Sequence, residues 1–300
     1  MTSNLTESYF RPDFRNDRYN PLRIWRVKPK EIPVTLIVGI VCKDSAIIAC
    51  ESQYTYGTRK DLDAEKTSVI HFKKGGALVA ESGFTDVSGR TVQFMREIAK
   101  DRELDNPWAI ADVAEEAVKR MRKFILESLC CETRSVEETQ MFFNGEQFRF
   151  DLMLAQMHDD TPYLYTLDSR RGVVTARPRY GIIGCGDDIA DFIFKDLNFK
   201  NISWKEAIAM SIYAIEKVKD RDTACGGLTR LTTMDANRIV PMPFTLMNKL
   251  TGKLKALSEA AKNKLREDIQ AVIDQTAKEV DEEAIRQLEA GYNESAEPTK

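Results

Sequence analysis

The sequence predicts an α+β fold with four layers, in which two antiparallel sheets lie face to face between two pairs of helices. Three observations favour this fold. A run of short apolar segments with tight turns begins near residue 35, helical periodicity follows it twice in succession, and the same order of strands and two helices then repeats. This order suggests two sheets, each formed by one β run and each continuing into a pair of helices. The composition supplies the core, because 43% of the 300 residues are hydrophobic.

The first β run is organised around residues 35–51, TLIVGIVCKDSAIIACE. Residues 35–41 are mostly β-branched and form a nearly continuous apolar run, as is typical of a strand buried on both faces. Lys43-Asp44-Ser45 form a turn, residues 46–50 form the second strand of a hairpin, and Glu51 lies at the end of that strand. Two more short strands follow, and their tight connections favour antiparallel pairing: 68–72 and 77–80.

The remaining elements follow from periodicity and from turn residues. Pro107 suits a helix start, and Asn144-Gly145 predicts a hairpin turn. A helix is expected from about residue 85, a second over 107–129, strands over 148–157, 163–167, 172–176 and 180–183, helices over 187–197 and 204–218, and strands over 228–233 and 238–241.

Both ends of the chain differ from this central part. Residues 1–34 are rich in proline and arginine and have no periodic apolar pattern, which indicates an N-terminal arm. From 253 to about 290 an apolar stripe predicts one long helix that packs on the body or on a neighbouring subunit. We therefore expect an extension over 1–34, a main domain over 35–245 and a helical extension over 246–300.

Composition argues against several classes of function. The 44 Lys and Arg residues nearly balance the 47 Asp and Glu residues, which disfavours a nucleic-acid binder. No apolar run suggests a membrane span or a secretory signal. Six cysteines without a CxxC pair and only two histidines argue against a zinc site, so we expect free thiols in a reducing cytoplasm.

Several motifs in this order resemble the proteasome β-type subunit family of N-terminal-nucleophile hydrolases. Residues 35–44, TLIVGIVCKD, are similar to the start of a mature subunit, and Glu51-Ser52-Gln53-Tyr54-Thr55 to the segment after the second strand. Gly184-Cys185-Gly186 resembles a glycine–hydroxyl–glycine turn, and residues 221–227, RDTACGG, resemble an Asp-x-x-Ser-Gly-Gly loop. The resemblance covers about residues 35–245, is greatest to the bacterial proteasome-like proteins, and implies the four-layer fold.

The resemblance also implies a chemistry. An N-terminal Thr35 would be the nucleophile of a threonine-type endopeptidase, with its own α-amine, whose pKa is about 8, as the base. Lys66 matches the lysine beside the nucleophile, Glu51 the carboxylate that pairs with it, and Asp222 the aspartate near the amine. Ala80 matches the position whose N–H stabilises the oxyanion. The residues that match substrate-binding positions are Tyr54, Thr55, Ser68, Leu78 and Ser82, with Asp86 as a further pocket candidate.

Two features depart from the family. Cys185 and Cys225 replace serines that surround the terminal amine, and a thiol is a weaker hydrogen-bonding group. Either cysteine as nucleophile is disfavoured, because neither has a histidine nearby in the sequence. Thr35 follows Pro33-Val34, whereas self-cleaving relatives cut after glycine, and valine resists the turn required there. One hypothesis is that Val34 marks the true start, from a GTG codon read as methionine, so that loss of this methionine exposes Thr35.

Three functions remain open at this point. The first is the endopeptidase in a homo-oligomeric ring, acting in the cytoplasm on peptides or unfolded proteins, with an ATP-dependent unfoldase as a candidate partner. The second is a catalytically silent structural subunit, and the third an N-terminal-nucleophile amidase acting on a small molecule. We expect no cofactor, metal, nucleic acid or membrane as a partner.

Overall fold

The structure is a computed structural model and describes residues 35–56, 59–128, 135–145, 148–195, 199 and 202–279. The chain divides into two compact units between Phe244 and Thr245. The expected arm over 1–34 lies outside the described residues, as do Pro33 and Val34. Within the described part, no helix combines the length and the apolar composition needed to cross a membrane.

Sheet 1 contains the hairpin that begins at residue 36. Its strands run antiparallel in the order β10-β1-β2-β11-β12. The two central strands are almost entirely buried, as their continuous apolar sequences require. The bounds are β10 (Tyr180–Gly184), β1 (Leu36–Val41), β2 (Ser45–Glu51), β11 (Thr229–Asp235) and β12 (Ile239–Pro241).

Sheet 2 is also antiparallel and has the order β5-β6-β7-β8-β9. A separate two-stranded hairpin, β3 with β4, follows β2 in the chain. The bounds are β5 (Thr67–His71), β6 (Gly76–Gly83), β7 (Phe150–His158), β8 (Thr161–Asp168), β9 (Val173–Ala176), β3 (Tyr54–Tyr56) and β4 (Arg59–Asp61).

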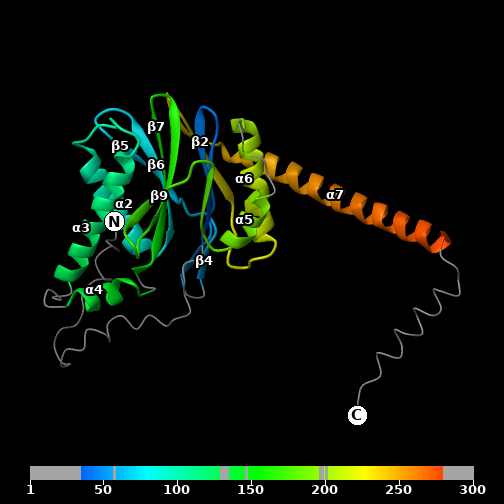
Figure 1. Cartoon of the computed structure of the whole chain (residues 1–300), viewed down its shortest axis with the longest axis horizontal. Coiled ribbons are helices and arrows are strands. Elements are labelled where there is room, and N and C mark those ends of the chain that lie inside the picture. Colours follow the sequence, from blue (N-terminus) through cyan, green and yellow to red (C-terminus); the bar gives the residue numbers. More distant parts are fainter. Residues whose placement is uncertain are drawn as a thin grey trace, which may run out of the picture. The chain divides into compact units, whose positions relative to one another are not determined.

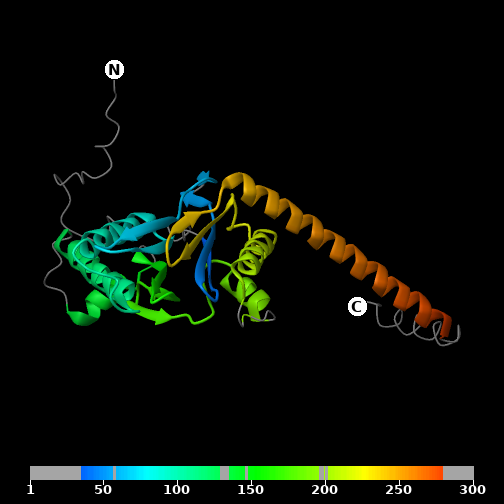
Figure 2. The ribbon, with the colours of Figure 1, turned by 90° about the horizontal axis from the view of Figure 1, so that it is seen from above.

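Helices cover the outer faces of both sheets, so the predicted fold class is confirmed (Figure 1). Helices α2 (Thr85–Ala99) and α3 (Ala109–Ser128) share one hydrophobic cluster with sheet 2. Helices α5 (Asp187–Lys195) and α6 (Trp204–Lys219) lie against sheet 1, and Figure 2 shows the same four layers from above. A capping box between Ser203 and Glu206 fixes the start of α6.

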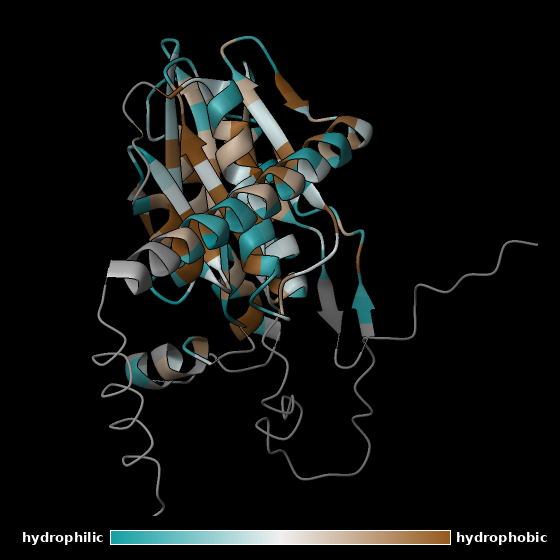
Figure 3. Ribbon diagram, turned by 90° about the vertical axis from the view of Figure 1, so that its right-hand side faces the viewer, coloured by the Kyte–Doolittle hydropathy of each residue, from teal (hydrophilic) through white to brown (hydrophobic). Residues whose placement is uncertain are grey.

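The space between the sheets is filled by a second apolar cluster. Side chains from both sheets meet there, and strands carry most of the hydrophobic colour in Figure 3. Its buried members are Ile37, Ala46, Ile48, Cys50, Leu78, Ala80, Met153, Ala155, Leu164, Ile183 and Met234. The face-to-face packing places the ends of β1, β2 and β6 beside one another, which brings together residues far apart in the sequence.

The long C-terminal helix α7 spans Phe244–Glu279 and therefore begins nine residues before the predicted start, at 253. Hydrophilic and hydrophobic residues alternate along it (Figure 3). Leu257, Leu265 and Ile269 of the predicted stripe are exposed. The partner of this stripe stays a prediction.

The structure corrects two local predictions. Each β run contributes to both sheets: β1 and β2 pair with β10 and β11, whereas β5 and β6 pair with β7. Sequence patterns define hairpins but not which hairpins meet, because long-range pairing depends on the whole core. Asn144-Gly145 does not join two strands; it follows the short helix α4 (Val136–Phe143), where a glycine commonly ends a helix.

We expect Asp151 to make the stability of this sandwich depend on pH. It stands opposite Asp168 across the β7–β8 pair, and burial followed by the charge of Asp168 raises its pKa from 3.8 to about 6. A carboxyl group with a raised pKa favours folding while it is protonated, and this contribution is lost as the pH rises from about 4 through 6. We expect Asp151→Asn to stabilise the protein by roughly 1–2 kcal/mol at pH 7 and by much less at pH 4. Urea unfolding at both pH values tests this, and an equal effect at both would contradict it.

Candidate active site

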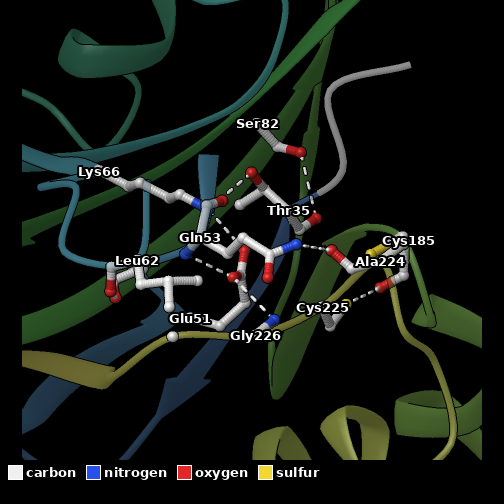
Figure 4. A network of polar contacts seen from close by, with 12 residues as sticks. Thr35, Glu51, Gln53, Leu62, Lys66, Ser82, Cys185, Ala224, Cys225 and Gly226 are labelled. Carbon is white, nitrogen blue, oxygen red and sulfur yellow. Dashed lines mark hydrogen bonds and ion pairs between the residues drawn. The ribbon is translucent and has the colours of Figure 1, made fainter. Parts of the chain in front are cut away.

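Thr35 lies immediately before β1, at the end of a central strand of sheet 1, and is fully buried. Its carbonyl oxygen accepts hydrogen bonds from the Cys185 N–H at 3.0 Å and from the Ser82 hydroxyl at 3.3 Å. The first contact continues the pairing of Leu36 with Gly184 across β1 and β10. Sheet 1 and β6 of sheet 2 therefore both hold the backbone at Thr35 (Figure 4).

Lys66 lies just before β5, and its side chain is buried beside Thr35. Its ammonium group donates to Thr35 Oγ1 at 2.8 Å, to Glu51 Oε1 at 2.5 Å and to the carbonyl oxygen of Gln53 at 2.6 Å. An ammonium group has three N–H donors, so these three acceptors suit it. The structure thus brings the hydroxyl of Thr35 and the amine of Lys66 into direct contact (Figure 4).

Glu51 is the counter-ion of Lys66, and neither side chain of the pair is exposed. Its second carboxylate oxygen accepts the N–H groups of Gln53, at 2.7 Å, and Gly226, at 3.2 Å. A buried charge is tolerated when it is both paired and hydrogen-bonded, and Glu51 meets both conditions. Both carboxylate oxygens of Glu51 are therefore bonded, one to Lys66 and the other to main-chain N–H groups.

Asp222, Cys185 and Cys225 form a second polar group beside Thr35. Cys185 follows β10, and the loop after α6 carries the other two residues. The Asp222 carboxylate accepts the Ala224 N–H at 2.9 Å, and the Cys225 thiol donates to the Cys185 carbonyl oxygen at 3.7 Å. The sulfur atoms of the two cysteines and a carboxylate oxygen of Asp222 lie within 4.8 Å of one another.

The surroundings of the Cys185 thiol disfavour its ionisation. Its hydrogen bond with Cys225, and then its burial, raise its pKa above the ordinary value. Because the thiolate is the reactive form of cysteine, a raised pKa disfavours Cys185 as a nucleophile. Cys42, Cys50, Cys185 and Cys225 are free thiols, as predicted, and Cys130 and Cys131 lie outside the described residues.

Of the predicted oxyanion and substrate residues, Ser82 alone has a described polar contact with Thr35. Ala80 and Leu78 lie in the core between the sheets, and Ala80 pairs with Thr67 and Met153 on its two sides. Ser68 accepts a hydrogen bond from Arg96, and Asp86 is exposed at the start of α2. For Tyr54 and Thr55 the structure describes only the backbone of β3. The roles of these residues stay predictions.

Gln53 is a site residue that belongs to one of the family-like motifs, but the sequence predicted no role for it. Its carbonyl oxygen accepts from Lys66, its N–H donates to Glu51, and its side-chain amide donates to the Ala224 carbonyl oxygen at 2.8 Å. Gln53 therefore joins the Thr35 network to the loop that carries Asp222. It lies two residues after Glu51, between β2 and β3, within the motif that begins at Glu51, and this position was the available signal.

Comparison with known proteins places the chain among proteasome subunits. The model of the family described as "Proteasome subunit" matches residues 35–234. A proteasome subunit beta 1 of Thermococcus onnurineus is 25% identical over 204 residues, covering 67% of this chain and 89% of the relative. A proteasome subunit beta of Methanobrevibacter smithii is 24% identical over 192 residues, covering 64% and 82%.

Solved structures share the fold at lower identity. Anbu, described as an ancestral beta-subunit, from Yersinia bercovieri has a TM-score of 0.60 at 11% identity over 77% of this chain and 96% of that one. The helical assembly of the Anbu complex from Pseudomonas aeruginosa gives 0.61 at 12% identity with the same coverage. The family model, which matches well over half of the chain, and the fold agree, and the chain therefore belongs to the proteasome subunit family.

Proposed function

We propose that the chain is a threonine-type endopeptidase subunit of a proteasome-like assembly, in which Thr35 is the nucleophile once its α-amine is free. The observation that carries this proposal is the contact between Thr35 Oγ1 and Lys66 Nζ, within a fully buried ion pair with Glu51. A hydroxyl alone is a poor nucleophile at neutral pH. A fixed positive charge beside it favours the developing alkoxide, and the charge of Glu51 keeps that cation in place.

In the proposed reaction the α-amine of Thr35, directly or through a water molecule, accepts the proton of Oγ1. Oγ1 attacks the carbonyl carbon of a peptide bond and forms an acyl-enzyme, while the amine of the cleaved peptide takes up the proton and leaves. Water then hydrolyses the ester and releases the acyl group from Thr35. Asp222, Cys185 and Cys225 would surround the α-amine. The main-chain contact from Cys185 to the Thr35 carbonyl oxygen supports their closeness.

We propose the assembly and its partners from the family and from the solved relatives. The Anbu complex of Pseudomonas aeruginosa is described as a helical assembly, which supports an oligomer of this chain. We also propose a homo-oligomeric ring in the cytoplasm, peptide or unfolded protein substrates, and an ATP-dependent unfoldase as partner. Membership of the family supports these proposals. The main domain over 35–245 would form the body of each subunit.

A second candidate is a catalytically silent structural subunit. The two cysteines at positions where the resemblance implies serines, and Val34 before Thr35, favour it. The buried network favours catalysis instead, because Lys66 and Glu51 carry desolvated charges that a purely structural subunit does not require.

Covalent labelling separates the two candidates. A peptide epoxyketone that needs both a hydroxyl and a free α-amine on one residue should modify Thr35 in the native protein, and mass spectrometry should show a peptide that begins at Thr35. We expect Thr35→Ala to abolish labelling and to lower peptide hydrolysis by roughly 10⁴–10⁶-fold, because the nucleophile is lost. Native protein that retains its full N-terminal arm and is not labelled would support the silent subunit. A panel of peptide and small amide substrates tests the amidase alternative.

A further inference from the structure

We propose that Cys185, Asp222 and Cys225 bind a thiophilic divalent cation, Zn²⁺ by its chemistry, on the flank of Thr35. Two thiols and one carboxylate converge there, and their three ligand atoms all lie within 4.8 Å of one another. Cys225 is buried, and the other two are partly exposed, so an ion can enter from solvent. Figure 4 shows the two cysteines side by side next to Thr35.

The ligand set and its spacing suit zinc. Thiolate sulfur and carboxylate oxygen are common zinc ligands at about 2.3 and 2.1 Å from the ion. Two such ligands on a tetrahedral ion are therefore roughly 3.5–3.8 Å apart. The ligand atoms lie within 4.8 Å of one another, so they need to approach by roughly 1 Å at most to reach that range. Thiolates also select zinc and cadmium over magnesium and calcium, which prefer oxygen ligands.

The backbone holds both ligand loops in place. Asp222 N–H donates to the Val218 carbonyl oxygen at the end of α6, and Cys225 N–H donates to the Asp222 carbonyl oxygen at 3.1 Å. The amide of Gln53 holds Ala224, between the ligands, and the N–H of Cys185 is bound to Thr35. Ligands that are fixed before an ion arrives lose little conformational entropy on binding.

Sequence spacing alone argues against such a site, since the cysteines do not form a CxxC pair. The fold nevertheless brings the two cysteines together from distant parts of the sequence. The loop after β10 and the loop after α6 meet beside β1, so ligands from two separate segments share one position. Binding would replace the two S–H protons, which are released to solvent, and leave a fourth position on the ion for a further ligand.

The consequence of binding rests on the proposed function, although the site itself does not. Asp222 and both thiols are the groups proposed to surround the α-amine of Thr35. An ion that takes them as ligands would withdraw them from the amine, and its fourth position is open to the amine itself. A bound cation would therefore inhibit acylation of Thr35 reversibly.

The test uses Cd²⁺ as the probe, because each thiolate–cadmium bond adds charge-transfer absorption in the ultraviolet. The full chain, reduced with a phosphine, is titrated with Cd²⁺. We expect one ion per chain, and a loss of affinity of more than about 100-fold in Cys185→Ser/Cys225→Ser. Serine restores the groups implied by the family, so this variant is expected to fold, and thermal unfolding checks that it does. Cys130→Ser/Cys131→Ser is the matched control and should keep the absorption.

Each outcome of these experiments either supports or overturns the cation site or its inhibitory role. Absence of a thiolate–cadmium band in the wild type, or an unchanged band in the Cys185→Ser/Cys225→Ser variant, would overturn the site. If the double variant fails to fold, the single variants Cys185→Ser and Cys225→Ser should each lose about half of the absorption per bound ion. Labelling of Thr35 with and without Cd²⁺ is a separate measurement. Cadmium binding with undiminished labelling overturns the inhibitory role alone, and a complete lack of labelling counts against the proposed function but not against the site.

Discussion

Lys66→Met is expected to lower the free energy of unfolding by about 3–5 kcal/mol, because it leaves the carboxylate of Glu51 buried without its cation. The pair is fully buried, and the ammonium group also binds Thr35 Oγ1 and the Gln53 carbonyl oxygen. Methionine has nearly the volume of lysine, so the loss measures charge rather than packing. The same change removes the proposed electrostatic aid to the nucleophile, and labelling of Thr35 should fall with it.

The double variant Lys66→Met/Glu51→Gln provides the control. Glutamine keeps the size of glutamate and an acceptor for the N–H groups of Gln53 and Gly226, but it carries no charge. We expect this variant to regain most of the lost stability and none of the lost labelling. Urea unfolding of both variants measures the difference. If the double variant is no more stable than Lys66→Met, an uncompensated charge is not the cause of the loss.

The sequence was sufficient for the layers of this fold because each layer has its own local pattern. The continuous apolar run of β1 and the stripe of α3 are strong signals, and both elements form within two residues of their predicted bounds. The distribution of hairpins between the sheets was not predictable, since β1 carries no mark that selects β10 rather than β6 as its partner.

The candidate site was predictable only in part, and through resemblance. Motif positions indicated Thr35, Glu51 and Lys66, and the structure brings these three into one network. Gln53 lies in one of these motifs, but its role was not predictable, because its contact with Lys66 uses a main-chain carbonyl oxygen that any residue could supply. The closeness of Cys185 to Cys225 likewise depends on how two loops meet, which no local pattern records.

Gly184→Ala is expected to be as damaging as the loss of Lys66, although it adds only one methyl group. Gly184 ends β10 with a φ of +100°, a conformation that residues with a Cβ rarely adopt. A Cβ at this position would overlap the carbonyl oxygen of Thr35 and press on the Ser82 hydroxyl. The nearer obstacle is a main-chain oxygen, which cannot rotate away from the methyl group as a side chain could, and both obstacles belong to the network that fixes the nucleophile.

The strain can be relieved only by separating the end of β10 from the start of β1. That movement would break the hydrogen bond from Cys185 N–H to the Thr35 carbonyl oxygen, and it would carry the hydroxyl of Thr35 away from Lys66. We expect a loss of about 3–5 kcal/mol of unfolding free energy from the backbone strain and the overlap together. Labelling of Thr35 should fall even under conditions in which the variant remains folded.

Gly89→Ala is the matched control, because it makes the same chemical change where the structure has room. Gly89 lies within α2, and a Cβ there would meet no atom within 4 Å. Alanine in the interior of a helix is more favourable than glycine by roughly 0.5–1 kcal/mol, so this variant should be slightly more stable than the wild type. Urea midpoints of the two variants should therefore move in opposite directions. A Gly184→Ala protein with the wild-type midpoint would show that β10 does not hold Thr35 in place, and the proposed geometry of the nucleophile would have to be abandoned.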